Sequence, residues 1–242
     1  MEAALYLIPV TLGETEISQV LPPYNHDIIV GIKHFIVENI RSARRFLKKT
    51  EKSIDIDELT FYELNRHTDR KFIGEYLEPL KKGLPVGIIS EAGCPAIADP
   101  GADVVAIAQQ RGYKVVPLVG PSSIIMSVMG SGFNGQSFAF NGYLPVDDTD
   151  RAKALKALET RAWNEHQTQL FIETPYRNLK MFKTLLSTLR PQTRLCIAAG
   201  ITTADEFIHT HTIAEWKKMG LPLKGAAGSD LSKVPAIFLI NK

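Results

Sequence analysis

The sequence contains few cysteines. Only Cys94 and Cys196 occur among 242 residues, which is too few for a disulfide framework, and the pair lacks metal-ligand spacing. The six histidines include no helical i, i+4 pair with an acid and no pairing with cysteine. We therefore expect no metal site, and we expect a cytoplasmic setting in which thiols stay reduced.

Long hydrophobic runs are also missing. No apolar run approaches the roughly 18 residues that a bilayer requires, and residues 1–4 lead directly into an apolar strand instead of a signal peptide. We expect neither a membrane span nor secretion. The first strand is followed by residues 9–13, which contain one glycine where a dinucleotide loop would have G-x-G-x-x-G. This absence disfavours a nicotinamide-dependent oxidoreductase.

Excess charge of one sign is absent as well. Lysine and arginine total 28 against 26 acidic residues, a formal net charge of +2, so nucleic-acid binding would depend on a local patch. One such patch lies on a predicted helix over residues 41–49 and contains Arg41, Arg44, Arg45, Lys48 and Lys49. The patch would hold RNA phosphates, or it is simply a solvated helix face.

The first half of the chain alternates strand-length apolar runs with helical patterns. This order predicts an α/β domain with a mostly parallel sheet and right-handed crossovers. The predicted strands cover residues 4–8, 28–31, 86–89 and 114–118, and the predicted helices cover 41–49, 71–82 and 102–111. Gly120-Pro121 interrupts the pattern, and Ser122 or Ser123 is placed to cap the next helix.

We place a domain boundary at this interruption, with one domain over residues 1–119 and a second over 120–242. The second half contains enough strand for its own core, in a mixed α/β sheet. Its predicted strands cover residues 137–143, 168–173, 194–199, 206–212 and 234–240, and its predicted helices cover 151–161 and 177–189.

The most informative segment is residues 90–101, Ser-Glu-Ala-Gly-Cys-Pro-Ala-Ile-Ala-Asp-Pro-Gly, which directly follows an apolar strand. Gly93 allows close approach of the backbone to a ligand, while Pro95 and Pro100 restrict the loop to few conformations. A loop of this kind at the carboxyl end of a strand is typical of ligand-binding sites in open α/β sheets. Its alternative role is that of a rigid turn between strand and helix.

This segment resembles the Ser-Asp-Ala-Gly-Thr-Pro-x-Ile-Ser-Asp-Pro-Gly loop of the tetrapyrrole methylase family, in the branch similar to the ribosomal RNA 2′-O-ribose (cytidine) methyltransferases of the small subunit. Four further blocks resemble family motifs in the expected order. They are Glu-Asn-Ile-Arg-Ser-Ala-Arg-Arg-Phe-Leu (38–47), Pro-Leu-Val-Gly-Pro-Ser-Ser (117–123), Phe-Ala-Phe-Asn-Gly-Tyr-Leu-Pro (138–145) and Glu-Thr-Pro-Tyr-Arg (173–177).

The resemblance implies a two-domain tetrapyrrole methylase-like fold, commonly a homodimer. S-adenosyl-L-methionine would be the methyl donor, bound in the cleft between the domains and released as S-adenosyl-L-homocysteine. Such a donor carries its own reactivity, so the protein mainly positions it. The residues expected to bind it are Pro9, Ser90, Glu91, Ala92, Gly93, Ile97, Ser122, Ser123, Glu173 and Thr174.

On the acceptor side, Glu38, Asn39 and Arg41 follow a strand and precede a helix. We assign catalytic roles to Glu38 and Arg41. Asn39 stands where the family motif has aspartate, and an amide cannot serve as a base. Glu38 or Glu91 would then have to compensate. The first loop, residues 9–17, also departs from the Pro-Ile-Gly-Asn-Leu-x-Asp-Ile pattern of the RNA-methylating branch.

Three functions remain open. The basic run favours a methyltransferase that acts on ribosomal RNA at a ribose 2′-oxygen. A large apolar cleft without that basic patch would favour a methyltransferase for a tetrapyrrole or another small acceptor. The asparagine at position 39 and the altered first loop leave room for a non-catalytic relative that only binds the donor.

Overall fold

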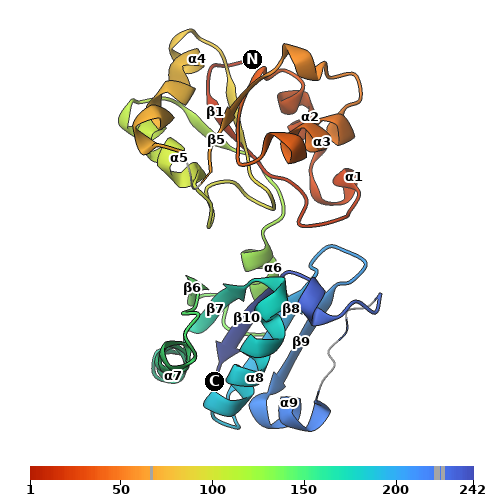
Figure 1. Cartoon of the computed structure of the whole chain (residues 1–242), viewed down its shortest axis with the longest axis vertical. Coiled ribbons are helices and arrows are strands. Elements are labelled where there is room, and N and C mark those ends of the chain that lie inside the picture. The colour runs from red at the N-terminus through yellow and green to blue at the C-terminus, as the bar shows by residue number, and fades with distance from the viewer. Residues whose placement is uncertain (66–67, 221–223, 225–226) are drawn as a thin grey trace. The chain divides into compact units, whose positions relative to one another are not determined.

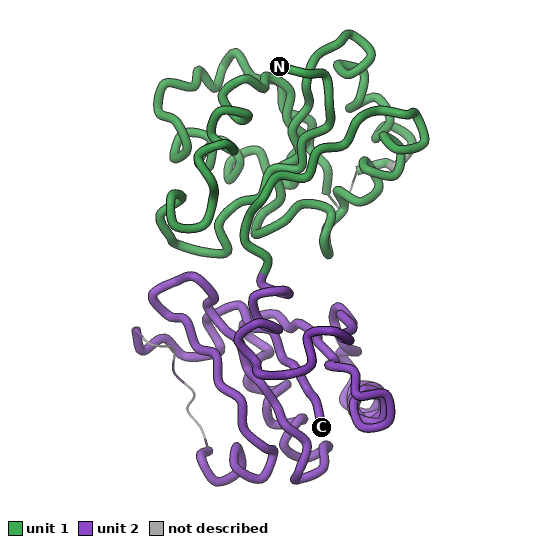
Figure 2. The backbone as a smooth tube through the Cα atoms, turned by 180° about the vertical axis from the view of Figure 1, so that it is seen from behind, with its two compact units in different colours: residues 1–122 green, residues 123–242 purple. Residues whose placement is uncertain are grey.

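The chain folds into two compact units, Met1–Ser122 and Ser123–Lys242 (Figure 2). The computed structural model describes residues 1–65, 68–220, 224 and 227–242. The first unit ends a few residues after the boundary expected from the sequence, where α6 (Ser123–Ser131) begins. A helix at this point agrees with the prediction made from Gly120-Pro121 and the two following serines.

The first unit contains a fully parallel five-stranded sheet with the order β3-β2-β4-β1-β5. Its strands are β1 (Leu5–Ile8), β2 (His34–Val37), β3 (Thr60–Glu63), β4 (Val86–Ile89) and β5 (Val115–Pro117). Central strands of parallel sheets are covered on both faces and are therefore apolar throughout. β4 agrees, since all four of its residues are buried. The predicted mostly parallel N-terminal sheet is confirmed.

Helices cover both faces of this sheet (Figure 1). On one face, α2 (Pro23–Ile29) and α3 (Ile40–Thr50) pack on a core that includes Ile8 and Phe35. On the other face, the 3-10 helix η2 (Arg70–Leu77), α4 (Glu78–Lys81) and α5 (Gly101–Gln110) pack on a core that includes Leu5 and Ile88. The short helices α1 (Ile17–Val20) and η1 (Ile56–Glu58) lie in the connections.

The predicted strand over residues 28–31 is wrong. Ile28 and Ile29 end α2 and are buried on its inner face with Asn25, a spacing of three to four residues that suits a helix. Pro23 stands in the first turn of this helix, where its fixed φ is favourable. The second strand of the sheet is instead β2, a few residues later, and the edge strand β3 was not anticipated.

The second unit contains a mixed five-stranded sheet with the order β6-β7-β10-β8-β9. Its strands are β6 (Phe138–Tyr143), β7 (Thr168–Glu173), β8 (Arg194–Ala199), β9 (Phe207–Thr212) and β10 (Ala236–Asn241). β6 and β7 are parallel, whereas the pairs β7–β10, β10–β8 and β8–β9 are antiparallel. The predicted mixed sheet is confirmed, and each of its predicted strands is present within a few residues.

One face of this sheet carries α7 (Asp148–Asn164), α8 (Asn178–Thr188) and α9 (Ile213–Met219). They enclose a core in which Phe171, Phe182 and Trp216 are fully buried. α6 packs on the opposite face, where the Thr210 hydroxyl donates to the Ser131 carbonyl at 2.8 Å. The 3-10 turns η3 (Pro175–Arg177) and η4 (Leu231–Lys233) flank α8. Within the described ranges, no helix combines the length and apolarity that a bilayer span requires.

Candidate active site

The carboxyl edge of the parallel sheet has a topological switch point between β2 and β4. These strands are neighbours, but the chain leaves β2 toward β3 and leaves β4 toward β5, on opposite sides. Such a divergence opens a crevice outside the carboxyl ends of the two strands, where ligands bind in open α/β folds. Glu38 directly follows β2, and Ser90 directly follows β4. The first unit therefore brings the proposed acceptor-side and donor-side residues to the same edge.

Three loops pack against one another beside this crevice. The Val10 amide donates to the Gly93 carbonyl at 3.0 Å, and the Cys94 thiol lies 3.4 Å from the Pro121 carbonyl. A Cβ on Gly120 would lie 2.3 Å from the Cβ and Cγ atoms of Pro9, so only glycine fits there. The loops after β1, β4 and β5 thus form one junction, which includes the predicted donor residues Pro9 and Gly93.

The loop after β4 contains three residues with left-handed backbone conformation. Gly93 has φ +68°, and the non-glycine residues Ala96 and Ala98 have φ 65° and 61°, which costs of order 1 kcal/mol each. Between the alanines, Ile97 points outward with 54% of its surface exposed. A rigid loop that presents an exposed side chain is consistent with a ligand-binding role.

Asp99 holds this loop in place. Its Oδ1 accepts from the Ala96 amide at 2.9 Å and from the Gly101 amide at 2.7 Å. Two backbone hydrogen bonds to one carboxylate offset the left-handed alanines between them. Asp99 was not among the site residues predicted from the sequence. Its signal was an aspartate before Pro-Gly at a helix start, where a short acidic side chain commonly accepts backbone amides.

A cluster of carboxylates lines the crevice. Glu38 Oε1 accepts from the Glu91 amide at 3.4 Å, and Glu91 Oε1 accepts from the Ser42 hydroxyl at 2.5 Å. Glu38, Asp99 and Ser90 also line a narrow slot of ≈ 10 Å³, which leaves room for about one water molecule. The crevice therefore holds three acidic side chains close together.

Burial sets the ionisation of these acids. Loss of solvent raises the pKa of Glu38, and the neighbouring charge of Asp99 raises it further. Burial also raises the pKa of Asp99, against the hydrogen bonds from Gly101 and Ala96 that lower it. No lysine or arginine occurs between residues 85 and 110. The carboxylates of the crevice suit a cationic ligand, and Glu38 is suited to accept a proton.

Asn39 caps α3. Its Oδ1 accepts from the Arg41 amide at 2.9 Å and from the Ser42 amide at 3.2 Å. Asparagine and aspartate are among the best N-cap residues, so the departure from the family motif preserves the helix start. The asparagine also holds Ser42 next to Glu91.

We expect Asn39→Ala to lower the free energy of unfolding by about 1 kcal/mol, because two amides of α3 lose their acceptor. Asn39→Asp should keep the stability within about 0.5 kcal/mol, since aspartate caps as well. Urea unfolding of the three proteins tests this. A stability loss in Asn39→Asp equal to that of alanine would contradict the capping role.

The five basic residues of α3 differ in their contacts. Lys49 Nζ donates to the Thr15 carbonyl at 2.8 Å, and Lys48 Nζ donates to the Lys52 carbonyl at 3.0 Å. Arg44 lies 5.4 Å above the Phe61 ring. Among the described residues, the guanidinium groups of Arg41 and Arg45 have no hydrogen-bond or ion-pair partner. All five side chains belong to exposed residues, so α3 presents a positive surface.

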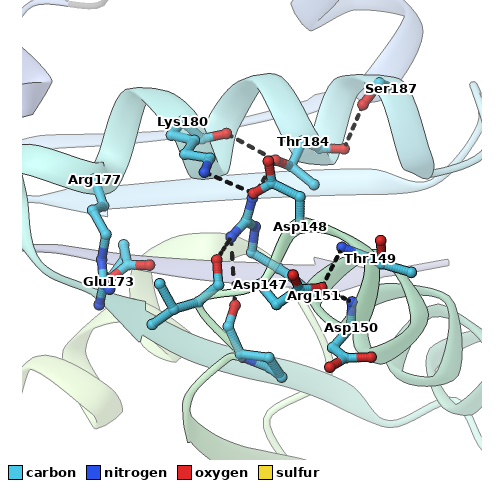
Figure 3. Close-up of polar contacts among 12 residues, drawn as sticks. Asp147, Asp148, Thr149, Asp150, Arg151, Glu173, Arg177, Lys180, Thr184 and Ser187 are labelled. Atoms are coloured by element: carbon cyan, nitrogen blue, oxygen red, sulfur yellow. Dashed lines mark hydrogen bonds and ion pairs between the residues drawn. The ribbon is translucent and has the colours of Figure 1, made fainter.

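The remaining predicted site residues lie at the end of the first unit or within the second unit. Ser122 precedes α6, and Ser123 is its first residue. Glu173 is buried at the end of β7, where its Oε1 accepts from the Thr174 amide at 2.7 Å and from Arg177 Nε at 2.8 Å. Figure 3 shows Glu173 and Arg177 next to each other. The Glu173 carboxylate thus fixes the turn into α8.

A second group of polar contacts in this unit surrounds Arg151 and joins neighbouring elements. Arg151, only 3% exposed, donates to the Val146 carbonyl at 2.8 Å and to Thr184 Oγ1 at 3.3 Å, and it pairs with Asp148 (Figure 3). These contacts tie α7 to the segment after β6 and to α8. Over the described part of the chain, no group of three or more histidine, cysteine or acidic residues is arranged to hold a metal ion.

The chain is similar in sequence to methyltransferases of ribosomal RNA. No family model matches it. It is 29% identical over 212 residues to the ribosomal RNA small subunit methyltransferase I of Vibrio cholerae serotype O1, an alignment that covers 87% of this chain and 69% of that protein. A protein of the same name from Buchnera aphidicola is 32% identical over 158 residues, with 64% of this chain and 54% of the relative covered. The chain therefore spans about half the length of several relatives that it matches.

Solved structures share the fold across both units. The structure of the methyltransferase CobJ superposes with a TM-score of 0.61 at 11% identity and covers 99% of this chain and 94% of its own. A uroporphyrin-III C-methyltransferase from Thermus thermophilus, in complex with S-adenosyl homocysteine, superposes with a TM-score of 0.55 at 13% identity. The superposition covers 99% of this chain and 97% of the other. Together with the ordered sequence blocks, these findings confirm the resemblance to the tetrapyrrole methylase family, in the branch similar to ribosomal RNA small subunit methyltransferases.

Proposed function

We propose that this protein transfers a methyl group from S-adenosylmethionine to ribosomal RNA, at a ribose 2′-oxygen. The observation that carries the proposal is the switch-point crevice, where a glycine-containing loop junction stands beside three carboxylates and a helix with a positive surface. The names of the relatives support the reaction and the class of acceptor.

The residues of the crevice fit the donor. Its sulfonium and ammonium groups are cationic, and the crevice is lined by Glu38, Glu91 and Asp99. The exposed residues Glu91 and Ala92 are placed to contact polar groups of the donor. A Cβ on Gly93 would lie 3.0 Å from Leu12 Cδ2 and 3.2 Å from the Pro121 carbonyl oxygen, so glycine keeps this loop closely packed.

Further donor contacts are assigned to Pro9 and Ser90, which belong to the same junction, and to the exposed Ile97. Ser122 and Ser123 would offer hydroxyls to the carboxylate end of the donor, at the start of α6. Glu173 and Thr174, whose side chains are hydrogen-bonded to each other and to Arg177, are assigned to the donor from the family resemblance alone.

The bound donor supplies an electrophilic methyl group. On transfer, the S–CH₃ bond would break as the O–CH₃ bond forms, and its electron pair would stay on the sulfur of a neutral thioether. Glu38 accepts the hydroxyl proton, because its partly desolvated carboxylate has a raised pKa and is a stronger base than an exposed glutamate. Arg41, with a guanidinium that has no partner among the described side chains, would neutralise an acceptor phosphate.

RNA as the acceptor is supported by α3, which contains five basic and no acidic residues between Ile40 and Thr50. A polyanion gains affinity from each phosphate that such a surface neutralises. The free thiols of Cys94 and Cys196 agree with a reducing cytoplasmic location, where ribosomal RNA is found.

Calorimetric titration with S-adenosylmethionine and S-adenosylhomocysteine, followed by transfer of a labelled methyl group to small-subunit ribosomal RNA, tests the proposal. We expect saturable donor binding and incorporation of label that is stable to base, as a 2′-O-methyl group is. No donor binding at millimolar concentration would overturn the methyltransferase assignment. Donor binding with transfer to porphyrinogen precursors but not to RNA would favour a small acceptor, and binding without transfer to either would favour a non-catalytic relative.

A further inference from the structure

A second, larger pocket lies next to the crevice in the first unit. It has a volume of ≈ 400 Å³ and is walled by three segments. These are the loop after β1 (residues 10–14), one face of α3, and the end of β4 with the two residues that follow it. A volume of this size is in the range of small-ligand sites, and it exceeds that of the narrow slot beside Glu38.

The α3 face of this pocket is defined by Ser42, Arg45, Phe46 and Lys49. Their spacing of three, four and seven residues places them on one side of the helix. With a rise of 1.5 Å per residue, the stretch from Ser42 to Lys49 extends for about 10 Å. This length is comparable to one nucleotide of a single strand.

The two ends of the pocket differ in charge. At one end, Ser42 is hydrogen-bonded to the Glu91 carboxylate, and the Glu91 amide contacts Glu38. Toward the other end lie the cations Arg45 and Lys49, with Phe46 between the polar groups. Lys49 is held by the Thr15 carbonyl, whereas Arg45 makes no polar contact within the described residues. One acid of the first loop, Glu14, also lines the pocket.

We propose that this pocket holds one nucleotide of the RNA acceptor, with its phosphate at Arg45 and Lys49 and its ribose toward Glu91 and Glu38. This inference rests on the proposed function and adds to it the site at which the protein binds one nucleotide of the acceptor RNA. Guanidinium groups bind phosphate oxygens in a bidentate manner, and Phe46 provides an apolar surface for the base. The pocket therefore selects a phosphate-bearing nucleotide over an uncharged nucleoside.

Replacement of Arg45, with Lys48 as the matched control, tests the inference. Both side chains are exposed cations of α3, but only Arg45 lines the pocket. We expect Arg45→Ala to weaken binding of a fluorescein-labelled single-stranded oligoribonucleotide about tenfold. It should also reduce the slope of log affinity against log salt concentration by about one. Lys48→Ala should weaken binding less than threefold, and Arg45→Lys should restore part of the affinity.

Competition with mononucleotides separates a pocket from a merely charged surface. Cytidine 5′-monophosphate should displace the labelled RNA from the native protein and from Lys48→Ala with similar potency, and at least tenfold less well from Arg45→Ala. Cytidine without phosphate should compete weakly in all three. Equal losses of RNA affinity in Arg45→Ala and Lys48→Ala would overturn the assignment of the pocket to a nucleotide. Equal competition by cytidine and cytidine 5′-monophosphate would also overturn it.

Donor titration of the same variants keeps this inference distinct from the proposed function. Arg45→Ala should bind S-adenosylmethionine like the native protein, since the side chain lies outside the loop junction. If the native protein methylates RNA and Arg45→Ala does so with unchanged KM, the pocket assignment fails while the proposed function stands. If the native protein binds no donor, the proposed function itself fails.

Discussion

Gly93→Ala should lower the affinity for S-adenosylmethionine at least tenfold and reduce the free energy of unfolding by about 1–2 kcal/mol. The backbone at this position has φ +68°, and a Cβ would lie 3.2 Å from the carbonyl oxygen of Pro121. A backbone oxygen cannot move without the rest of its loop, so the junction between the loops after β4 and β5 must shift. Calorimetric donor titration and urea unfolding measure the two effects.

Gly112→Ala is the matched control for this prediction. Gly112 has φ +69°, and a Cβ there would have no neighbour within 4 Å. The backbone cost of alanine is therefore about the same, roughly 1 kcal/mol, without any effect on the loop junction. We expect Gly112→Ala to lose stability and keep donor affinity. If both variants bind the donor equally well, donor affinity does not depend on the packing around Gly93.

The fold was largely predictable because apolar runs and turn residues coincide in most of the chain. β4, with four buried residues between Pro85 and the Ser90 loop, and the helix α3 have unambiguous patterns. The wrong strand at residues 28–31 shows the weakness of short apolar runs, which suit a buried helix segment and a strand equally. The preceding Pro22-Pro23 was the better signal, since proline is favoured in the first turn of a helix.

The candidate site was predictable only as separate segments. The loop over residues 90–101 could be identified from its glycines and prolines, because these residues determine local backbone conformation. The hydrogen bond from Ser42 to Glu91 joins residues 49 positions apart, and no local pattern reports such a pairing. The same holds for the contact of Gly120 with Pro9, which requires the parallel pairing of β1 with β5.

Asn39 illustrates how structure changes the meaning of a sequence difference. An amide in place of the family aspartate suggests a lost catalytic base when only the motif is considered. In the structure, the side-chain oxygen of Asn39 accepts hydrogen bonds from two amides at the start of α3. Aspartate and asparagine cap helices in the same way. The nearest acid with a raised pKa is Glu38, one residue earlier at the end of β2. The proposed chemistry therefore depends on the residue that the difference leaves unchanged.

Glu38→Gln should lower kcat for methyl transfer by about 10²- to 10⁴-fold, the usual contribution of a general base, with a much smaller loss of donor affinity, because Glu91 and Asp99 keep their charges. Glutamine retains the Oε1 acceptor for the Glu91 amide, so the crevice should keep its shape. Burial raises the pKa of Glu38 in the folded state, so its ionisation opposes folding. The stability that protonated Glu38 contributes is therefore present at low pH and is lost as pH rises through that pKa. Glu38→Gln should be at least as stable as the native protein at pH 8.

The pH dependence of activity identifies the group that acts as the general base. Because a general base must be ionised, native activity should fall as pH decreases through the pKa of Glu38, which lies above the usual value of 4.5 owing to burial and to the charge of Asp99. Asp99→Asn removes that charge and retains an oxygen for the Ala96 and Gly101 amides. We therefore expect this variant to shift the acidic limb of kcat/KM to lower pH. An acidic limb that does not shift in Asp99→Asn, or full activity in Glu38→Gln, would show that another group is the general base. Glu91 is the remaining carboxylate of the crevice.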